Sequence, residues 1–272
     1  MLKIRILTAL IIFPATLAVV FLAPPWLFRL VVALVLLTGC WEFRRIADLD
    51  ARRGWALMAI QVAILALMLV YWPVTGEDAL WILAAGCVTW LLLLSRLAMF
   101  RPGSRPDDDF RLLGLVSAIA CITFCSFALF WLRDLPRGDV IVFLLFLLIW
   151  ASDVGAYFSG RLLGRRKLAP AISPKKTWEG VYGGIALAIA AAFLLANVIA
   201  GLDLSPLSLV VISVVTTLSS VGGDLFISVH KRTVGVADTG TLFPGHGGVL
   251  DRYDSLLAGA PFFALAFGLL AL

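Results

Sequence analysis

Apolar segments of bilayer length recur along the whole chain and leave few folds open to it. A membrane-spanning helix needs about 20 predominantly apolar residues, and a soluble domain of ordinary composition carries about 25% charged residues. Here 62% of the residues are hydrophobic and only 14% are charged. We therefore predict an all-α, polytopic integral membrane protein with about nine transmembrane helices. The nine candidate spans are 6–22, 26–43, 55–73, 79–98, 112–132, 139–158, 181–200, 207–227 and 253–271.

The loop cations predict how these spans are oriented. Cytoplasmic loops of membrane proteins carry an excess of Lys and Arg. With nine spans, all of the 22 Lys and Arg residues except Arg29, Arg133 and Arg137 fall on one side of the membrane. We expect that side to be cytoplasmic, with the N-terminus inside and the C-terminus outside. This bias explains the net charge of +5, which therefore gives no indication of nucleic-acid binding.

Polar residues divide the chain into two parts. Residues 1–138 are read as about five spans with short loops, whereas residues 139–272 form a membrane region whose polar residues concentrate in the loops 159–180 and 228–252. Polar residues between membrane spans are costly and commonly functional. Both loops face the same side, so we expect them to converge on one site. Some charges of the first part need no function, because long side chains at a helix end reach the membrane surface. These are Glu42, Arg44 and Arg45.

The first of these loops contains a pattern typical of a helix start. Ser173 and Pro174 suit the cap and first positions of a helix, which would place Lys175, Lys176 and Thr177 in the first turn. Free backbone N–H groups and the helix dipole favour an anion there, whereas two ammonium groups oppose the dipole. The pattern predicts a polyphosphate site. The alternative is that the lysines are ordinary cytoplasmic cations.

Asp153 lies within an apolar stretch just before this loop. A carboxylate inside a membrane segment costs roughly 2.5–3.5 kcal/mol on insertion scales. We therefore expect a metal or a cationic partner, and the candidate partners are Arg161 or a lysine of the loop.

The second loop begins at the end of the eighth span. Asp224 and Ser228 are four residues apart and share a helix face, and Lys231 and Arg232 follow them. A run of glycines then excludes a regular helix and can offer clustered N–H groups to phosphate oxygens. These glycines are Gly235, Gly240, Gly245, Gly247 and Gly248.

Acidic residues open the last span. Asp224 and Asp251 are the natural pair for a Mg²⁺ site, because hard cations take carboxylate and phosphate oxygens. A salt bridge from Asp251 or Asp254 to Arg232 is the structural alternative. His246 is either a catalyst or a residue that stabilises the loop by hydrogen bonds.

The chemistry of these residues favours phosphoryl or nucleotidyl transfer over hydrolysis. No general base is evident, and a phosphomonoester nucleophile needs none, because its second pKa is about 6. Lys and Arg side chains together with a metal ion can align two anionic phosphates and neutralise their repulsion.

From Ser152 to Asp254 the chain resembles the phosphatidate cytidylyltransferase (CDP-diacylglycerol synthase) family. The resemblance is carried by Asp153–Phe158, Lys167–Pro170, Ile172–Gly180, Gly223-Asp224, Ser228, Lys231-Arg232 and Phe243–Arg252. It implies a polytopic enzyme, usually a homodimer, that converts CTP and phosphatidate into CDP-diacylglycerol and pyrophosphate. It also implies a plasma (bacterial inner) membrane location with the active site facing the cytoplasm.

The residues and the resemblance together give a set of expected roles. The catalytic candidates are Asp224, Asp251, Lys176, Asp238 and His246. The phosphate-binding candidates are Ser173, Lys175, Lys176, Thr177, Lys231, Arg232, Gly247, Gly248 and Arg252. Asp224 and Asp251 are the expected Mg²⁺ ligands, with a second metal or a monovalent cation left open. Further candidates without an assigned role are Asp153, Ser228 and Asp254.

Three positions depart from the family pattern. Ala237 replaces a lysine, His230 replaces an apolar residue, and Tyr253 replaces an aliphatic residue, Phe or Thr. Loss of one ammonium group beside a polyphosphate would cost about 2–4 kcal/mol of transition-state stabilisation. His230 is a candidate substitute cation. Two alternatives to the enzyme stay open: an impaired relative that binds nucleotide or lipid phosphate, and a cytidylyltransferase for another lipid phosphate.

Overall fold

The computed structural model describes residues 2–73, 76–199, 204–242 and 247–271, with side chains from residue 10 onward. Within these ranges it consists of nine α-helices, one short 3₁₀ helix and one two-stranded sheet. Eight of the helices are long and apolar enough to cross a membrane, and residues Leu10–Leu22 of the first, whose side chains are described, form a shorter apolar helix. The all-α polytopic fold is thereby confirmed. The elements are α1 (Leu2–Leu22), α2 (Pro25–Ile46), α3 (Ala51–Val70), α4 (Glu77–Ser95), η1 (Arg96–Met99), α5 (Asp108–Asp134), α6 (Gly138–Leu162), β1 (Lys167–Ala169), β2 (Ser173–Thr177), α7 (Trp178–Val198), α8 (Pro206–Val234) and α9 (Leu250–Ala271).

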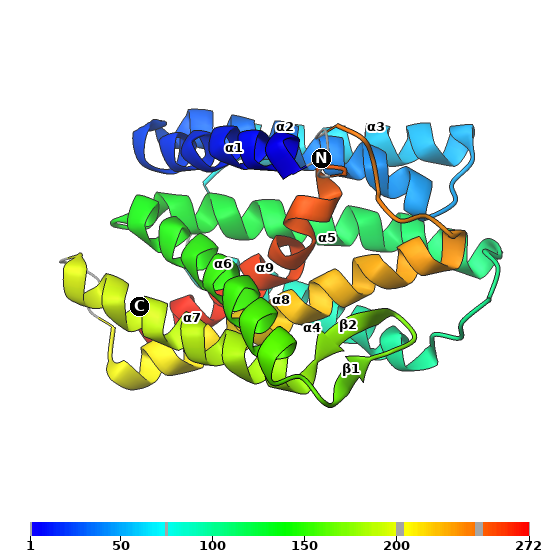
Figure 1. Cartoon of the computed structure of the whole chain (residues 1–272). Helices are drawn as coiled ribbons and strands as arrows, with labels where there is room; N and C mark the ends of the chain where they lie inside the picture. Colours follow the sequence, from blue (N-terminus) through cyan, green and yellow to red (C-terminus); the bar gives the residue numbers. More distant parts are fainter. Residues whose placement is uncertain (1, 74–75, 200–203, 243–246, 272) are drawn as a thin grey trace.

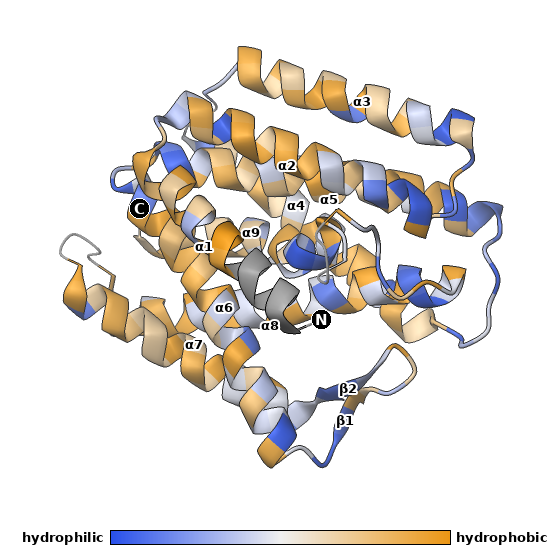
Figure 2. Ribbon diagram, turned by 45° about the horizontal axis from the view of Figure 1, so that its top comes forward, coloured by the Kyte–Doolittle hydropathy of each residue, from blue (hydrophilic) through white to orange (hydrophobic). Residues whose placement is uncertain are grey.

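The helices form one bundle in which the polar residues gather near one end. Helices α1, α2 and α3 lie along one edge of the bundle, and the β1–β2 hairpin projects near the opposite edge (Figure 1). Figure 2 shows hydrophilic residues at the hairpin and at the neighbouring ends of α2 and α3, whereas most of the helix surface is hydrophobic. This distribution suits a bundle that is surrounded by lipid.

Helices α6 and α7 pack with their backbones in contact. A Cβ atom at Gly155 would lie 2.4 Å from the carbonyl oxygen of Gly183, and one at Gly184 would lie 2.8 Å from that of Ser152. Small residues at such crossings allow close packing of membrane helices. This contact fixes Asp153 of α6 beside the segment that enters α7.

The predicted helix start at Ser173 is wrong. Residues Ser173–Thr177 form strand β2, which pairs antiparallel with β1, and the helix begins at Trp178. Thr177 is the N-cap, because its Oγ1 accepts a hydrogen bond of 3.1 Å from the N–H of Gly180. Pro174 is tolerated because a two-stranded sheet has only edge strands. The lysines therefore extend from a hairpin, and the argument from the helix dipole does not apply to them.

Helices α8 and α9 are longer than predicted and cross closely near their polar ends. Helix α8 continues beyond the predicted end at 227 and stops at Gly235, whose φ of 75° suits a glycine C-cap. A Cβ atom at Gly223 would lie 2.5 Å from the carbonyl oxygen of Asp254. The side chains of Lys231 and Asp251 are consequently held on regular helices.

Candidate functional site

Asp224 of α8 and Lys176 of β2 form the first ion pair of the candidate site. Lys176 Nζ lies 2.6 Å from Asp224 Oδ2, and Ser228 Oγ donates a hydrogen bond of 3.2 Å to Asp224 Oδ1. The predicted sharing of one helix face by Asp224 and Ser228 is confirmed. Hairpin and helix thus bring together two residues that are far apart in sequence.

Lys231 and Asp251 form the second ion pair. Lys231 Nζ lies 2.7 Å from Asp251 Oδ1, and the two side chains are only 14% and 6% exposed. The predicted alternative partner Arg232 instead donates from Nε to the carbonyl oxygen of Ile172 at 3.2 Å. Successive helical residues point about 100° apart, so only Lys231 reaches Asp251, while Arg232 ties the end of α8 to the hairpin loop.

Asp251 also organises the loop between α8 and α9. Its Oδ2 accepts hydrogen bonds from the N–H of Thr239 at 2.8 Å, the Oγ1 of Thr239 at 3.0 Å and the N–H of Gly248 at 3.0 Å. A Cβ atom at Gly247, where φ is 82°, would lie 2.7 Å from Asp251 Oδ2 and 3.2 Å from Asp238 Oδ1. Asp238 is therefore next to Asp251, as a shared site requires, and both carboxylates flank Gly247.

Asp153 and Asp254 complete an acidic cluster around Asp224. Asp153 interacts electrostatically with Asp224, Lys176 and Arg252, and Asp254 does so with Asp224, Lys231 and Lys176. Arg161, which was one predicted partner of Asp153, instead donates to the hydroxyl of Tyr157 at 2.8 Å. The predicted lysine partner of Asp153 is Lys176.

A cavity of about 220 Å³ opens beside these residues. Its lining combines cations, carboxylates and hydroxyl groups from α6, β2, α7 and α8. The predicted site residues on its wall are Asp153, Lys175, Lys176, Thr177 and Asp224. Among the described residues, no group of three or more His, Cys, Asp or Glu side chains is arranged as a complete metal site. Any ion held here would need ligands from a bound molecule.

Other predicted residues have separate positions. Ser173 lies at the start of β2, outside the cavity lining. Arg252 is exposed on the first turn of α9. His246 lies outside the described residues.

Glu42 has a structural position near the candidate site that the sequence did not reveal. The expectation that it reaches out from a helix end is wrong, since it is only 8% exposed. Its Oε2 accepts hydrogen bonds from Thr239 Oγ1 at 2.9 Å and the N–H of Leu250 at 2.8 Å, and its Oε1 accepts from the N–H of Val249 at 3.0 Å. A Cβ atom at Gly248 would lie 2.2 Å from this carboxylate. Glycine is therefore required there, and Glu42 fixes the loop whose Thr239 and Gly248 donate hydrogen bonds to Asp251 of α9.

His230 is a core residue. It is 2% exposed, and its ring packs against the rings of Phe43, Phe110 and Phe226. Its Nδ1 lies 3.1 Å from the carbonyl oxygen of Phe226. The expectation that His230 replaces a missing phosphate-binding cation is wrong, because the side chain is buried among aromatic rings and does not line the cavity.

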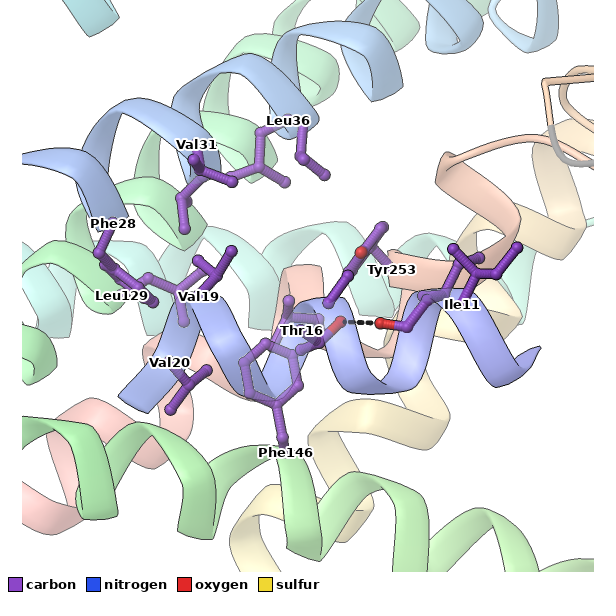
Figure 3. Close-up of a pocket in the computed structure, with 15 residues that line it drawn as sticks. Ile11, Thr16, Val19, Val20, Phe28, Val31, Leu36, Leu129, Phe146 and Tyr253 are labelled. Atoms are coloured by element: carbon purple, nitrogen blue, oxygen red, sulfur yellow. Dashed lines mark hydrogen bonds between the residues drawn. The ribbon is translucent and has the colours of Figure 1, made fainter. Parts of the chain in front are cut away.

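A second cavity, of about 240 Å³, is apolar and lies between α1, α2, α5, α6 and α9 (Figure 3). Val19, Phe28, Leu129 and Phe146 contribute to its wall. Its one residue from the polar end of α9 is Tyr253, which stands between Arg252 and Asp254 in sequence. The cavity therefore lies in the apolar part of the bundle, and none of the predicted site residues that the structure describes is on its wall.

The family model and the similar proteins that match this chain are all cytidylyltransferases. The model of the Cytidylyltransferase family matches residues 3–270. A Haemophilus influenzae protein named phosphatidate cytidylyltransferase is 36% identical, over 97% of this chain and 98% of its own length. A Pseudomonas aeruginosa protein of the same name is 38% identical, over 97% and 96%. A Bacillus subtilis protein, also of that name, is 41% identical over 52% of each chain.

Proposed function

This chain belongs to the cytidylyltransferase family, and we propose that it transfers CMP from CTP to phosphatidate, giving CDP-diacylglycerol and pyrophosphate. A phosphate oxygen of the lipid attacks the α-phosphorus of CTP. A bond forms between that oxygen and the α-phosphorus while the bond to the β-phosphate oxygen breaks, and pyrophosphate leaves. The observation that carries this proposal is the pairing of Lys176 with Asp224 and of Lys231 with Asp251, in one site built from a hairpin and two helices.

The lysines supply the electrostatic part of the reaction. Near neutral pH the lipid phosphate is largely a dianion, so the nucleophile needs no general base. Two anionic phosphates repel each other, and preorganised cations that neutralise this repulsion lower the barrier. Lys176 and Lys231 are held in place by their carboxylates. Lys175, Arg232 and Arg252 are the further cations that we assign to phosphate binding.

The carboxylates suit a Mg²⁺ ion. Their oxygens are hard donors, and Mg²⁺ is commonly bound by one or two carboxylates together with substrate phosphates. Asp224 and Asp251 would hold the ion, which would supply further neutralisation of phosphate charge when bound. The gathering of Asp153, Asp224 and Asp254 around Lys176 also suits a cation here. A second metal or a monovalent cation stays a proposal for the same two carboxylates.

The apolar cavity supports a lipid acceptor. It has the hydrocarbon lining that an acyl chain needs, with Tyr253 and Leu256 contributed by α9. The hydroxyl of Thr16 donates to the carbonyl oxygen of Ile12 at 2.9 Å, so this polar group of the wall is already satisfied. A water-soluble acceptor would gain nothing from this space.

We also propose that the protein lies in the plasma membrane with this site facing the cytoplasm. The concentration of cations on one side supports this orientation. The four cysteines are free and buried, so an Arg165→Cys variant offers a clean label. In intact cells that cysteine should react with membrane-permeant thiol reagents only. Reaction with an impermeant reagent would show that this site faces the outside of the cell and would contradict the proposal. The homodimer stays a prediction from the resemblance.

The test of the function is a turnover assay with purified protein, CTP labelled at the α-phosphate, phosphatidate and Mg²⁺. We expect labelled CDP-diacylglycerol and an equal amount of unlabelled pyrophosphate, because the labelled α-phosphate stays in the lipid product. A panel of other lipid phosphates in the same assay distinguishes a different acceptor. Absence of product with every lipid phosphate would remove the proposal.

A second candidate function rests on Ala237. This exposed residue stands where the family carries a lysine, so a binding protein without turnover is the alternative. Comparison with Ala237→Lys decides between the two functions. Turnover by the Ala237→Lys variant but not by the wild-type protein would show that the wild-type site is disabled. Turnover by the wild-type protein would show that this chain does not need the lysine.

A further inference from the structure

An open cavity of about 700 Å³ lies between α2, α3 and the loop that follows α8. It is separate from the cavity that Lys176 and Asp224 line. Its wall is charged and polar at one end, with Trp41, Arg44, Arg45 and the loop residues 239–242. The remainder of the wall is apolar and includes Leu34, Leu37 and Met58.

The two arginines of this wall have no carboxylate partner in the part of the chain that the structure describes. By contrast, Arg53 and Arg111 both pair with Asp108. The Nε of Arg44 is buried and has no hydrogen-bond partner among the described residues. A buried donor without an acceptor is costly, so an acceptor from a bound molecule would be stabilising.

The guanidinium group of Arg44 is held in place. Its centre lies 3.9 Å from the centroid of a Trp41 ring, which is a favourable cation–π contact. Its side-chain stem passes over Gly54, where an added Cβ atom would lie 2.3 Å from Cδ of Arg44. Arginine in a fixed orientation is well suited to bidentate binding of a phosphate group.

The shape of the wall identifies the source of that phosphate. From Arg45 to Leu34 the cavity follows α2 for roughly 16 Å, at 1.5 Å per residue. Trp41 pairs with Trp55 at 5.4 Å, and both rings are partly exposed, as is typical of the interface between bilayer and water. Basic pockets at this depth bind lipid headgroups. We propose that this cavity binds the phosphate group of an anionic phospholipid, with acyl carbons along Leu34, Leu37 and Met58.

Glu42 lies on the same wall, and its charge must be considered. Both of its oxygens are occupied by hydrogen bonds from Thr239, Val249 and Leu250. With two arginines against one satisfied carboxylate, the cavity keeps a net positive charge. A lipid bound here touches the loop that holds Asp251, so its occupancy is coupled to the candidate active site. The binding itself does not depend on the proposed function.

The test measures lipid retention by native mass spectrometry of the full chain. The variant Arg44→Gln/Arg45→Gln is compared with Arg52→Gln/Arg101→Gln, which removes two exposed cations that line no such cavity. The probes are phosphatidylglycerol, phosphatidate and uncharged diacylglycerol. Phosphatidylglycerol is a phosphodiester and no substrate for cytidylyl transfer, so it separates this site from the catalytic one.

We expect the Arg44→Gln/Arg45→Gln variant to bind phosphatidylglycerol at least about tenfold more weakly, since charge-assisted hydrogen bonds to the phosphate are lost. The control pair should bind as the wild type does. Equal binding by both double variants would overturn the proposal. So would equal binding of diacylglycerol, or displacement of the lipid by inorganic phosphate at the same concentration. If the double variant does not fold, Arg45→Gln alone repeats the test, because that side chain is exposed.

Discussion

The carboxylate of Glu42 accepts a hydrogen bond of 2.8 Å from the backbone N–H of Leu250, 208 residues further along the chain. The same carboxylate binds Val249 and Thr239. Thr239 in turn donates to Asp251. The second helix of the chain therefore positions a carboxylate on the last one, and the two halves of the sequence form one site.

Replacing Glu42 with Ala should destabilise the protein and stop turnover. The backbone N–H groups of Val249 and Leu250 would lose their acceptor, whereas the hydroxyl of Thr239 can still donate to Asp251. Each unsatisfied donor costs about 1–3 kcal/mol. We expect a loss of roughly 3 kcal/mol or more in the free energy of unfolding, measured as a lower thermal midpoint, together with loss of CDP-diacylglycerol formation. Glu42→Gln keeps the size of the side chain and one acceptor oxygen. Its thermal midpoint and activity should therefore lie between those of the wild type and of Glu42→Ala. Wild-type midpoint and activity in Glu42→Ala would contradict this role.

Replacing Gly248 with Ala should damage the same contact from the other side. The added Cβ would lie 2.2 Å from Glu42 Oε2 and 2.3 Å from Thr239 Oγ1. We expect the strain of overpacking, about 1–3 kcal/mol, and at least a tenfold loss of kcat/KM. Gly39→Ala is the matched control, since its Cβ meets only Leu250 Cδ1 at 3.9 Å and should leave activity unchanged. Equal behaviour of the two variants would show that the close contact does not matter.

Lys176→Met should lower kcat/KM by at least about 100-fold, because one preorganised donor at a developing charge is worth that much. The variant also leaves Asp224 without its cation. Lys167→Met is the control on the same hairpin, since Lys167 Nζ donates to the carbonyl oxygen of Pro174 within that hairpin. We expect that variant to stay within about threefold of wild type. Steady-state kinetics over a range of CTP concentrations makes the comparison, and a similar loss in both variants would point to hairpin damage.

Asp224→Asn should raise the Mg²⁺ concentration needed for half-maximal activity by at least about tenfold, because an amide oxygen is a weaker ligand than a carboxylate. The amide keeps the size of the side chain and can still accept from Ser228, so the fold should be retained. Asp109→Asn, an exposed position in the first turn of α5, should leave the Mg²⁺ dependence unchanged. Titration of Mg²⁺ into metal-free protein makes the measurement. An unaltered dependence in Asp224→Asn would remove this residue from the metal site.

Most of the fold could be predicted because its signal is local. Each span is a run of apolar residues that has to satisfy its backbone hydrogen bonds as a helix. The placement of Asp224 and Ser228 on one face follows from helical periodicity alone. The positions of Lys231 at the end of α8 and of Asp251 near the start of α9 followed in the same way. Lys231 and Asp251 form the second ion pair of the candidate site.

The errors concern residues whose environment is set by distant partners. Ser173 and Pro174 satisfy the local rule for a helix start, but the pairing of β2 with β1 and the cap at Thr177 decide otherwise. Glu42 sits close to a helix end, and nothing near it in sequence indicates that Thr239, Val249 and Leu250 will cover it. No local rule distinguishes a charged residue that turns inward from one that reaches the membrane surface.

The pairing of each lysine with an aspartate has a consequence for how the protein tolerates its own site. Lys176 with Asp224 and Lys231 with Asp251 form units of zero net charge, so these two lysines are compensated in a region where charge is expensive. A polyanion would have to displace the aspartates from these lysines before it could bind to them. In the proposed function the freed aspartate would then be available to a metal ion, so we predict that nucleotide and metal would each favour binding of the other.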